Sequence, residues 1–358
     1  MKKFLFFIFL FLLACGFFYF KKNSQPTIKK ATEKPTPPNR FDYSNNRSKD
    51  KNELKKSVFV PYWTSWETPP KEEFQRLIYF GVAVNNQGVS KDDSGYEKLP
   101  DFNVLAGKTT DKWLTIRMTN TEINLSILNN QSSWQKITLE SCDIAQNYNF
   151  SGLVLDLEIA SLPLDKLVNQ VNKFVEYFYK QTRSRRLKLA VIIYGDVFFR
   201  QRPFDVKFIS QNSDEIMIMA YDFHKSFGEP GPNFPLSGRE KYGYDLTKAT
   251  DDFLSVVSAK KLTFVFGFYG YDWTVDEEQR PIKQAKALTL NQIKTKFGEK
   301  SENIKRDPLS TESFIKYTDE NNMSHVVWFE DEKSVAKKQE FLKSKGINSF
   351  AHWAWGYY

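Results

Sequence analysis

Eight short apolar runs rich in β-branched and aromatic residues alternate with longer amphipathic stretches after residue 57, and this alternation limits the possible folds most strongly. The runs cover residues 58–63, 77–84, 113–118, 152–157, 187–194, 215–221, 263–269 and 347–353. Each run predicts a strand. A helix is predicted after Pro163, where apolar residues follow helical spacing at Leu167, Val171, Phe174, Val175 and Phe178. Repeated strand–helix units predict a parallel sheet covered by helices.

Eight such units predict an α/β fold, a (β/α)8 TIM barrel, whose active site lies at the carboxyl ends of the strands. We expect a small insertion between the seventh strand and the last helix. The alternative is a doubly wound open sheet, but no Gly-x-Gly-x-x-Gly sequence follows any of the strands. The barrel would occupy residues 57–358 as one catalytic domain.

Residues 1–20 predict a membrane-targeting segment, because Lys2 and Lys3 precede an unbroken apolar run over residues 4–20. Within this run, residues 12–15 (Leu-Leu-Ala-Cys) resemble a bacterial lipoprotein box, which implies lipid attachment at Cys15. The apolar run continues beyond Cys15, so an uncleaved helix spanning about 25 Å is the alternative. Both readings predict an exported protein that is tethered to the membrane in the cell envelope.

Residues 21–56 predict a flexible basic linker, because they are rich in Lys, Asn, Thr, Ser and Pro and poor in aliphatic side chains. Of the 51 Lys and Arg residues, 13 lie in residues 1–56, against 4 of the 43 Asp and Glu residues. The rest of the chain is therefore almost neutral, and we expect no nucleic-acid partner. The linker lysines either attract anionic lipid or wall polymer, or only keep the linker solvated.

The fourth run carries the most specific chemistry. Side chains alternate along a strand, so one face carries Gly152, Val154, Asp156 and Glu158, and the other carries Leu153, Leu155 and Leu157. We expect the leucines to face the helices, and Asp156 and Glu158 to point into the barrel near its rim. Their proximity should raise the pKa of one carboxyl group, as a general acid requires. The alternative is a pair of solvated charges at a strand end.

This segment resembles the D-x-x-D-x-D-x-E motif of glycoside hydrolase family 18, the chitinase-like family. Further matches follow in chain order at residues 61–66 (Pro-Tyr-Trp-Thr-Ser-Trp), 219–222 (Met-Ala-Tyr-Asp), 268–273 (Phe-Tyr-Gly-Tyr-Asp-Trp) and 353–356 (Trp-Ala-Trp-Gly). Residues 326–331 (Val-Val-Trp-Phe-Glu-Asp) are similar to the branch that contains bacterial spore and cell-wall glucosaminidases. The resemblance covers residues 57–358.

The resemblance implies a retaining, substrate-assisted mechanism in which the protein supplies no nucleophile. It implies Glu158 as the acid and base, Asp156 as the residue that holds the substrate acetamido N–H, and Tyr221 as the residue that bonds its carbonyl. It implies substrate contacts at Tyr62, Trp63, Met219, Asp222, Tyr269 and Trp353. The expected partner is an N-acetylglucosamine polysaccharide, either peptidoglycan or chitin. We expect no cofactor and a monomer.

Two positions depart from the family motif. Ser151 and Val154 stand where the family has its first and second Asp. Without the second carboxylate, we expect Asp156 to pair permanently with Glu158 and the pH optimum to shift, with acid catalysis retained. Two further hypotheses are a barrel that binds such sugars without cleaving them and an envelope scaffold. The presence of Glu158 argues against the first, and the complete set of strand-end residues argues against the second.

The remaining polar candidates predict structure. The three histidines, His224, His325 and His352, have no close metal-ligand spacing, so we expect no metal site. No motif places a base beside Cys142, which predicts a buried structural thiol. Residues 227–243 are rich in Gly and Pro and predict a long loop at the catalytic end, which either shapes the cleft or is a mobile surface loop.

Overall fold

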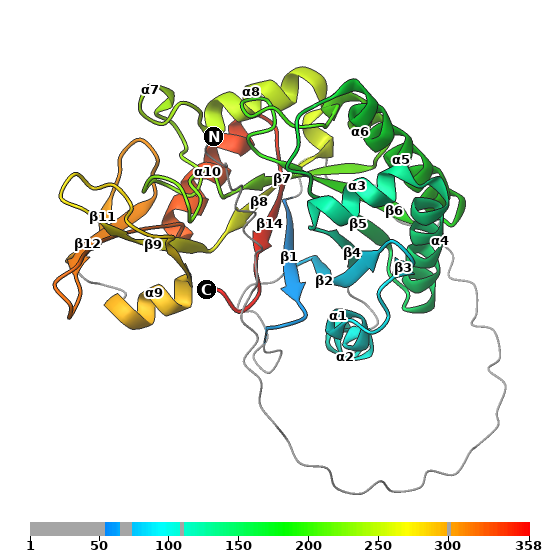
Figure 1. Ribbon diagram of the computed structural model, residues 1–358, viewed down its shortest axis with the longest axis horizontal. Coiled ribbons are helices and arrows are strands. Elements are labelled where there is room, and N and C mark those ends of the chain that lie inside the picture. The colour runs from blue at the N-terminus through cyan, green and yellow to red at the C-terminus, as the bar shows by residue number, and fades with distance from the viewer. Residues whose placement is uncertain (1–53, 65–73, 108–110, 299–301) are drawn as a thin grey trace, which may run out of the picture. The chain divides into compact units, whose positions relative to one another are not determined.

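A computed structural model describes residues 54–64, 74–107, 111–298 and 302–358. In these residues eight parallel strands close into a barrel in the order β1-β14-β8-β7-β6-β5-β4-β2, with β1 pairing β2 (Figure 1). The strands are β1 (Lys55–Pro61), β2 (Arg76–Asn85), β4 (Asp111–Met118), β5 (Gly152–Leu157), β6 (Lys188–Tyr194), β7 (Glu215–Ala220), β8 (Leu262–Gly267) and β14 (Ser349–Trp353). The predicted (β/α)8 barrel is confirmed. Residues 1–20 with Cys15, the linker up to residue 53, and Ser65 and Trp66 lie outside the described residues.

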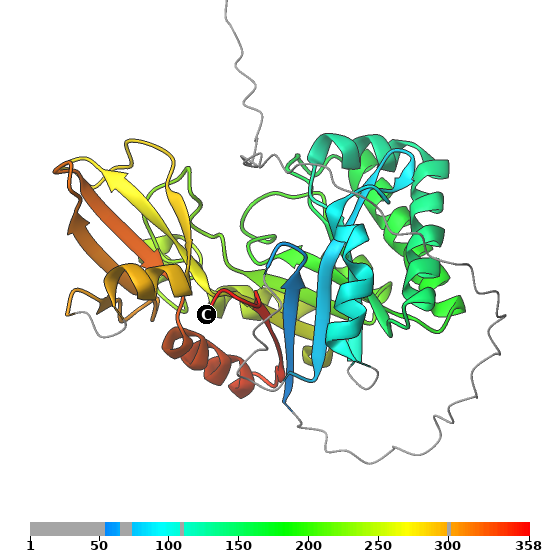
Figure 2. The same cartoon turned by 90° about the horizontal axis from the view of Figure 1, so that it is seen from below.

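Helices cover the outside of the barrel strands (Figure 2). They are α1 (Ser94–Glu97), α2 (Leu99–Ala106), α3 (Thr121–Asn129), α4 (Gln131–Asn147), α5 (Asp165–Ser184), α6 (Val206–Gln211), α8 (Leu246–Val256), the 3-10 helix η1 (Ala259–Lys261) and α10 (Glu332–Ser344). The short helix α7 (Arg239–Tyr242) lies in the loop after β7. The helix expected after Pro163 is α5, and its predicted apolar stripe is buried. None of the helices in the described residues is both long and apolar enough to cross a membrane.

The two faces of each barrel strand pack into separate apolar cores. On β5, Leu153, Leu155 and Leu157 join the outer core, which also contains the α5 residue Phe174. Val154 joins the inner core of the barrel, whose other buried members are Phe59, Ile78, Phe80, Trp113, Ala190, Ile192, Met217, Met219, Val265, Ala351 and Ala354. The predicted assignment of the leucines to the helix side and of Val154 to the barrel interior is therefore confirmed.

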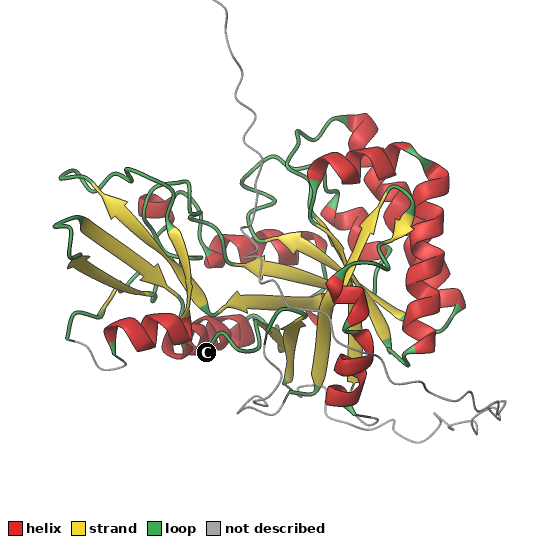
Figure 3. Ribbon diagram, turned by 60° about the horizontal axis from the view of Figure 1, so that its bottom comes forward, coloured by secondary structure: helices red, strands yellow, loops and turns green. Residues whose placement is uncertain are grey.

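The expected insertion between β8 and α10 is also confirmed. It forms a five-stranded antiparallel sheet separate from the barrel strands, in the order β10-β9-β13-β12-β11 (Figure 3). Its elements are β9 (Tyr269–Val275), β10 (Lys286–Thr289), α9 (Leu290–Phe297), β11 (Lys305–Arg306), β12 (Ser313–Thr318) and β13 (Ser324–Phe329). The short strand β3 (Gly88–Val89) is not part of this insertion and forms a hairpin with the barrel strand β2.

Three barrel strands end earlier than the sequence predicts. Trp63 and Tyr221 follow β1 and β7 instead of ending them, and Tyr269 opens β9 in the insertion instead of closing the seventh barrel strand. The chain changes sheets here because β8 pairs with β7 and β14, whereas β9 pairs with β10 and β13. A Cβ atom at Gly267 would lie 2.3 Å from the Tyr269 ring, so the crossing requires glycine.

A fully buried ion cluster joins α10 to the insertion and to the loop after β7. The Lys338 ammonium lies 2.6 Å from a Glu312 oxygen and also contacts Glu330, and none of these three side chains is exposed. Glu312 accepts hydrogen bonds from the backbone N–H groups of Asn233 (2.5 Å) and Phe234 (2.8 Å). Burial raises the pKa of Glu330 to about 8, so a proton on this group leaves the cluster close to neutral.

Replacing Lys338 by Met should therefore be strongly destabilising, because two buried carboxyl groups lose their only cation in the cluster. We expect the free energy of unfolding to fall by about 3–5 kcal/mol, measured by denaturant titration. The control is Lys337→Met on the exposed side of α10, which should change it by less than about 0.5 kcal/mol. Equal effects of the two variants would contradict this role of Lys338.

Candidate active site

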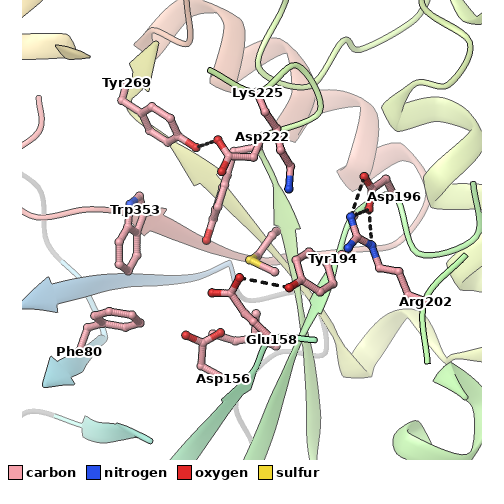
Figure 4. Close-up of a pocket in the computed structure, with 14 residues that line it drawn as sticks. Phe80, Asp156, Glu158, Tyr194, Asp196, Arg202, Asp222, Lys225, Tyr269 and Trp353 are labelled. Carbon is pink, nitrogen blue, oxygen red and sulfur yellow. Dashed lines mark hydrogen bonds and ion pairs between the residues drawn. The ribbon is translucent and has the colours of Figure 1, made fainter. Parts of the chain in front are cut away.

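A cavity of about 210 Å³ lies at the carboxyl ends of the barrel strands (Figure 4). Seven of the residues predicted from the sequence line it: Asp156, Glu158, Met219, Tyr221, Asp222, Tyr269 and Trp353. They come from β5, β7, β9 and β14, or from the residues directly after these strands. The other lining residues are Phe80, Ile192, Tyr194, Gly195, Asp196, Arg202 and Lys225.

Backbone hydrogen bonds hold Glu158 at the point where β5 ends. Its N–H group donates to the carbonyl of Met118 at 2.8 Å, which extends the pairing between β4 and β5 by one residue. The buried amide of Asn124 donates to the carbonyls of both Met118 (2.6 Å) and Glu158 (2.7 Å). The turn after β5 is thereby fixed, and the Glu158 side chain reaches the cavity.

Burial sets the electrostatics of the two carboxyl groups. Asp156 is 3% exposed, and its pKa is raised well above the usual value, first by burial and then by the charge of Glu158. Burial also raises the pKa of Glu158, opposed by a hydrogen bond from Tyr194 and by the charges of Lys225 and Arg202. Both carboxyl groups therefore bind a proton more readily than they do in water.

The expected direct pair between Asp156 and Glu158 is not formed. Glu158 Oε2 accepts a hydrogen bond from the Tyr194 hydroxyl at 3.1 Å, and the described residues show no hydrogen bond between the two carboxyl groups. Tyr194, at the end of the neighbouring strand β6, occupies this side of Glu158 (Figure 4). The charge of Glu158 still raises the pKa of Asp156.

Aromatic side chains form the opposite side of the cavity. Trp353 packs edge-on against Phe80, with ring centroids 4.7 Å apart, and lies stacked beside Tyr221 at 6.5 Å. The peptide bond between Trp353 and Ala354 is cis. Burial and the nearby carboxylates raise the pKa of Tyr221 well above its usual value, so its hydroxyl keeps its proton and remains a donor. Flat rings of this kind suit the apolar faces of sugars.

Asp222 is held by tyrosines from the insertion. Its carboxylate accepts hydrogen bonds from the hydroxyls of Tyr269 and Tyr271, the latter at 2.8 Å. Its backbone has a positive φ of 57°, and its N–H group donates to Asn233 Oδ1 at 2.8 Å. The insertion thus contributes directly to the wall of the cavity.

Tyr62 and Trp63 do not line the cavity. Tyr62 packs beneath the guanidinium of Arg117, 4.7 Å from its ring centre. Trp63 is 46% exposed and lies edge-on to Trp353 at 6.2 Å, so it borders the aromatic wall from outside. Trp273 is fully buried in the core of the insertion.

The two departures from the family motif have different surroundings. The Ser151 hydroxyl donates to Asp111 and to the carbonyl of Lys112, at the start of β5 and away from the cavity. Val154 is fully buried in the inner core, one inward-facing position before Asp156. An apolar side chain therefore replaces a carboxyl group directly below the acid pair.

The sequence analysis missed four polar residues of the cavity, Tyr194, Asp196, Arg202 and Lys225. Tyr194 is the last residue of a predicted strand, so the sequence could have predicted its position at the rim of the barrel. Arg202 and Lys225 lie in loops that follow β6 and β7, where no periodic pattern indicates the direction of a side chain. The loop over residues 227–243 does lie at the catalytic end, since its Asn233 binds Asp222.

Cys142 and the three histidines do not line the cavity. Cys142 is fully buried on α4, and burial raises its pKa to about 11, as expected of an unreactive structural thiol. In the part of the chain that the structure describes, no group of three or more His, Cys, Asp or Glu side chains is placed to hold a metal ion.

A closed parallel barrel with two neighbouring carboxyl groups inside the end of its fourth strand, facing an aromatic wall, is the architecture of a barrel glycosidase. The chain belongs to family 18 of the glycosyl hydrolases, because the model of "Glycosyl hydrolases family 18" matches residues 58–357.

Known relatives agree with the expected branch. The cortical fragment-lytic enzyme of Bacillus subtilis is 23% identical over 241 residues, which cover 66% of this chain and 53% of the relative. The chain spans from 53% to 64% of the length of the first curated relatives that it matches.

Solved structures share the fold. The Bacillus cereus spore cortex-lytic enzyme SleL superposes with a TM-score of 0.67 at 20% identity, covering 85% of this chain and 71% of SleL. The class V chitinase from Nicotiana tobaccum superposes with a TM-score of 0.72 at 16% identity, covering 84% of this chain and 94% of that one.

Tyr194→Phe should raise the pKa of Glu158. The hydroxyl donates to the carboxylate and so stabilises its charged form, and its loss leaves burial less opposed. The shift can be measured by ¹³C NMR titration of labelled glutamate carboxyl groups. Tyr177→Phe on α5 serves as the control and should leave the titration unchanged, whereas an unchanged or lower pKa in Tyr194→Phe would refute the contact.

Proposed function

We propose that this protein is a retaining glycosidase that cleaves β-1,4-linked N-acetylglucosamine-containing polymers and is tethered to the cell envelope. The observation that carries the proposal is the placement of Glu158, with a raised pKa, beside Asp156 and Tyr221 in a cavity walled by Trp353. Membership of family 18 and the names of the relatives, which include cortex-lytic enzymes and a chitinase, support the same substrate class.

Glu158 starts the reaction as a general acid. It donates its proton to the glycosidic oxygen, and its raised pKa favours the protonated form that this step requires. The carbonyl oxygen of the substrate's own 2-acetamido group attacks the anomeric carbon as the leaving sugar departs, which forms an oxazolinium ion.

Asp156 and Tyr221 orient the acetamido group. Asp156 accepts a hydrogen bond from the acetamido N–H and stabilises the positive charge of the oxazolinium ion. The Tyr221 hydroxyl donates to the carbonyl side. Glu158, now ionised, then takes a proton from a water molecule that attacks the anomeric carbon from the face that the leaving sugar occupied. Two inversions at the same carbon give overall retention.

Glu158→Gln should remove the acid without changing the shape of the side chain. We expect kcat to fall by about 10²–10⁴-fold, with oligosaccharide affinity nearly unchanged. The measurement is the release of reducing ends by the detergent-solubilised full-length chain from chitin oligomers and from peptidoglycan in parallel. Glu340→Gln on the exposed side of α10 is the control.

The wild-type protein decides between catalysis and binding. The proposal expects the β-anomer as the first product in NMR spectra, because the mechanism retains configuration. Wild-type protein that binds oligosaccharides and never cleaves them would instead favour a carbohydrate-binding barrel.

The tether is a separate part of the proposal and rests on residues 12–15 and the apolar run around them. We expect the protein in the membrane fraction, anchored through lipid on Cys15. Cys15→Ser should abolish incorporation of labelled lipid in cells, whereas thermal unfolding of the barrel should not change. Unchanged lipid labelling in this variant would show that Cys15 is not the lipid attachment site. The apolar run would then be interpreted as an uncleaved membrane helix.

A further inference from the structure

A second hollow of about 340 Å³ opens beside the catalytic cavity and shares Arg202 and Lys225 with it. We call this hollow the side groove. Arg200, Phe223 and the 70% exposed Phe227 also line it. Two cationic residues therefore lie where the cavity that contains Glu158 meets the side groove.

Arg202 is fixed in position. Its Nε and Nη2 groups donate to the two oxygens of Asp196 at 3.0 and 3.2 Å, and its guanidinium lies 3.7 Å from the centre of the Tyr194 ring. Arg200 binds the same carboxylate. One carboxylate thus faces two guanidinium groups, which leaves positive charge in excess. The side chain of Arg202 is only 11% exposed, so little freedom remains to be lost on binding a ligand.

Lys225 supplies a second cation without a carboxylate partner. Among the described residues, no carboxylate oxygen lies within 4.0 Å of its ammonium group, and no hydrogen bond from that group is found. Its side chain reaches from the loop after β7 toward the space above Tyr194 and Glu158 (Figure 4). A partly enclosed ammonium group of this kind gains most from an anionic ligand.

The other titratable groups of the side groove do not cancel this charge. Glu229 is exposed and interacts with Arg280. The His224 ring contacts the carbonyl of Pro232 at 2.7 Å, and burial lowers its pKa, which keeps it neutral at pH 7. In the side groove three cations therefore face Asp196 and the exposed Glu229, and two of them, Arg202 and Lys225, also act on Glu158 in the neighbouring cavity.

We propose that Arg202 and Lys225 form an anion subsite that binds a carboxylate carried by the glycan, as on the lactyl groups of peptidoglycan. This inference rests on the proposed function and narrows its substrate class to carboxylated N-acetylglucosamine polymers. In peptidoglycan every second sugar bears a lactyl group, which ends in a carboxylate or continues into a peptide stem with carboxylates. Chitin is uncharged and would desolvate both cations without giving them a counter-charge.

The test compares two matched ligands in a protein that binds without turnover. Full-length Glu158→Gln protein is titrated calorimetrically with chitotetraose and with a peptide-free tetrasaccharide of alternating N-acetylglucosamine and N-acetylmuramic acid. We expect the acidic ligand to bind more tightly. When Lys225→Met is combined with Glu158→Gln, the affinity for the acidic ligand divided by that for chitotetraose should fall about tenfold, as expected for one lost charge-assisted hydrogen bond. Lys225→Arg should retain the ratio, because it keeps the charge.

A matched control separates local from general charge effects. Lys260 lies in η1, before the start of β8 and therefore at the end of the barrel opposite the cavity. The variant Lys260→Met should leave the affinity ratio unchanged. Raising NaCl from about 50 to 500 mM should weaken binding of the acidic ligand to the parent protein more than binding to Lys225→Met. Far-UV circular dichroism checks the fold of each variant, and Lys225→Gln replaces Lys225→Met if that variant unfolds.

Two results would overturn the anion subsite: equal affinity for the two ligands in the parent protein, or an affinity ratio in Lys225→Met equal to that of the parent, which means equal loss for both ligands. Lys225→Met could weaken the binding of both ligands equally and, in protein that retains Glu158, shift the pH–rate profile. Lys225 would then act only by lowering the pKa of Glu158. Absence of hydrolysis by wild-type protein would refute the proposed function instead, because the affinity ratio is measured without turnover.

Discussion

Closure of the eight strands into a barrel gives each strand an inner and an outer face, and the site depends on this constraint. On β5 the outer face is all leucine and packs against the helices, so the carboxyl groups of the other face have only the barrel interior to enter. Burial there raises the pKa of Asp156 and Glu158. The same packing that stabilises the fold therefore also favours the protonated form of both carboxyl groups.

The insertion takes part in the site through buried polar contacts. Lys338 holds Glu312, Glu312 accepts from the backbone of Asn233, and Asn233 in turn accepts from the backbone of Asp222. Tyr269 and Tyr271 complete the arrangement by donating to the Asp222 carboxylate. The loop after β7 is thus positioned by groups from β9, from α10 and from Glu312 directly before β12, because buried polar groups need partners.

Charge around Glu158 is balanced between burial, which favours its protonated form, and Tyr194, Lys225 and Arg202, which favour the ionised form. In the mechanism that we propose, Glu158 first gives a proton and then takes one back, and these opposing influences on its pKa serve both steps. Val154 removes one carboxyl group from this balance, since it occupies the inward position next to Asp156 with an apolar side chain. The cations on the groove side of Glu158 also make this half of the cavity unlike its aromatic half.

The sequence by itself determined the barrel, the insertion, the two faces of β5 and the residues that end the strands, because these follow from periodicities along one element. Asp156 and Glu158 were predictable for this reason, whereas Tyr221, Asp222 and Trp353 were predicted from the resemblance of residues 219–222 and 353–356 to family 18. Only the tertiary structure placed Trp63 outside the cavity, moved Tyr269 into the insertion, and brought Arg202 and Lys225 to Glu158. Loops lack a repeating pattern, and their side chains take directions set by distant partners such as Asp196, which become neighbours only when the barrel closes.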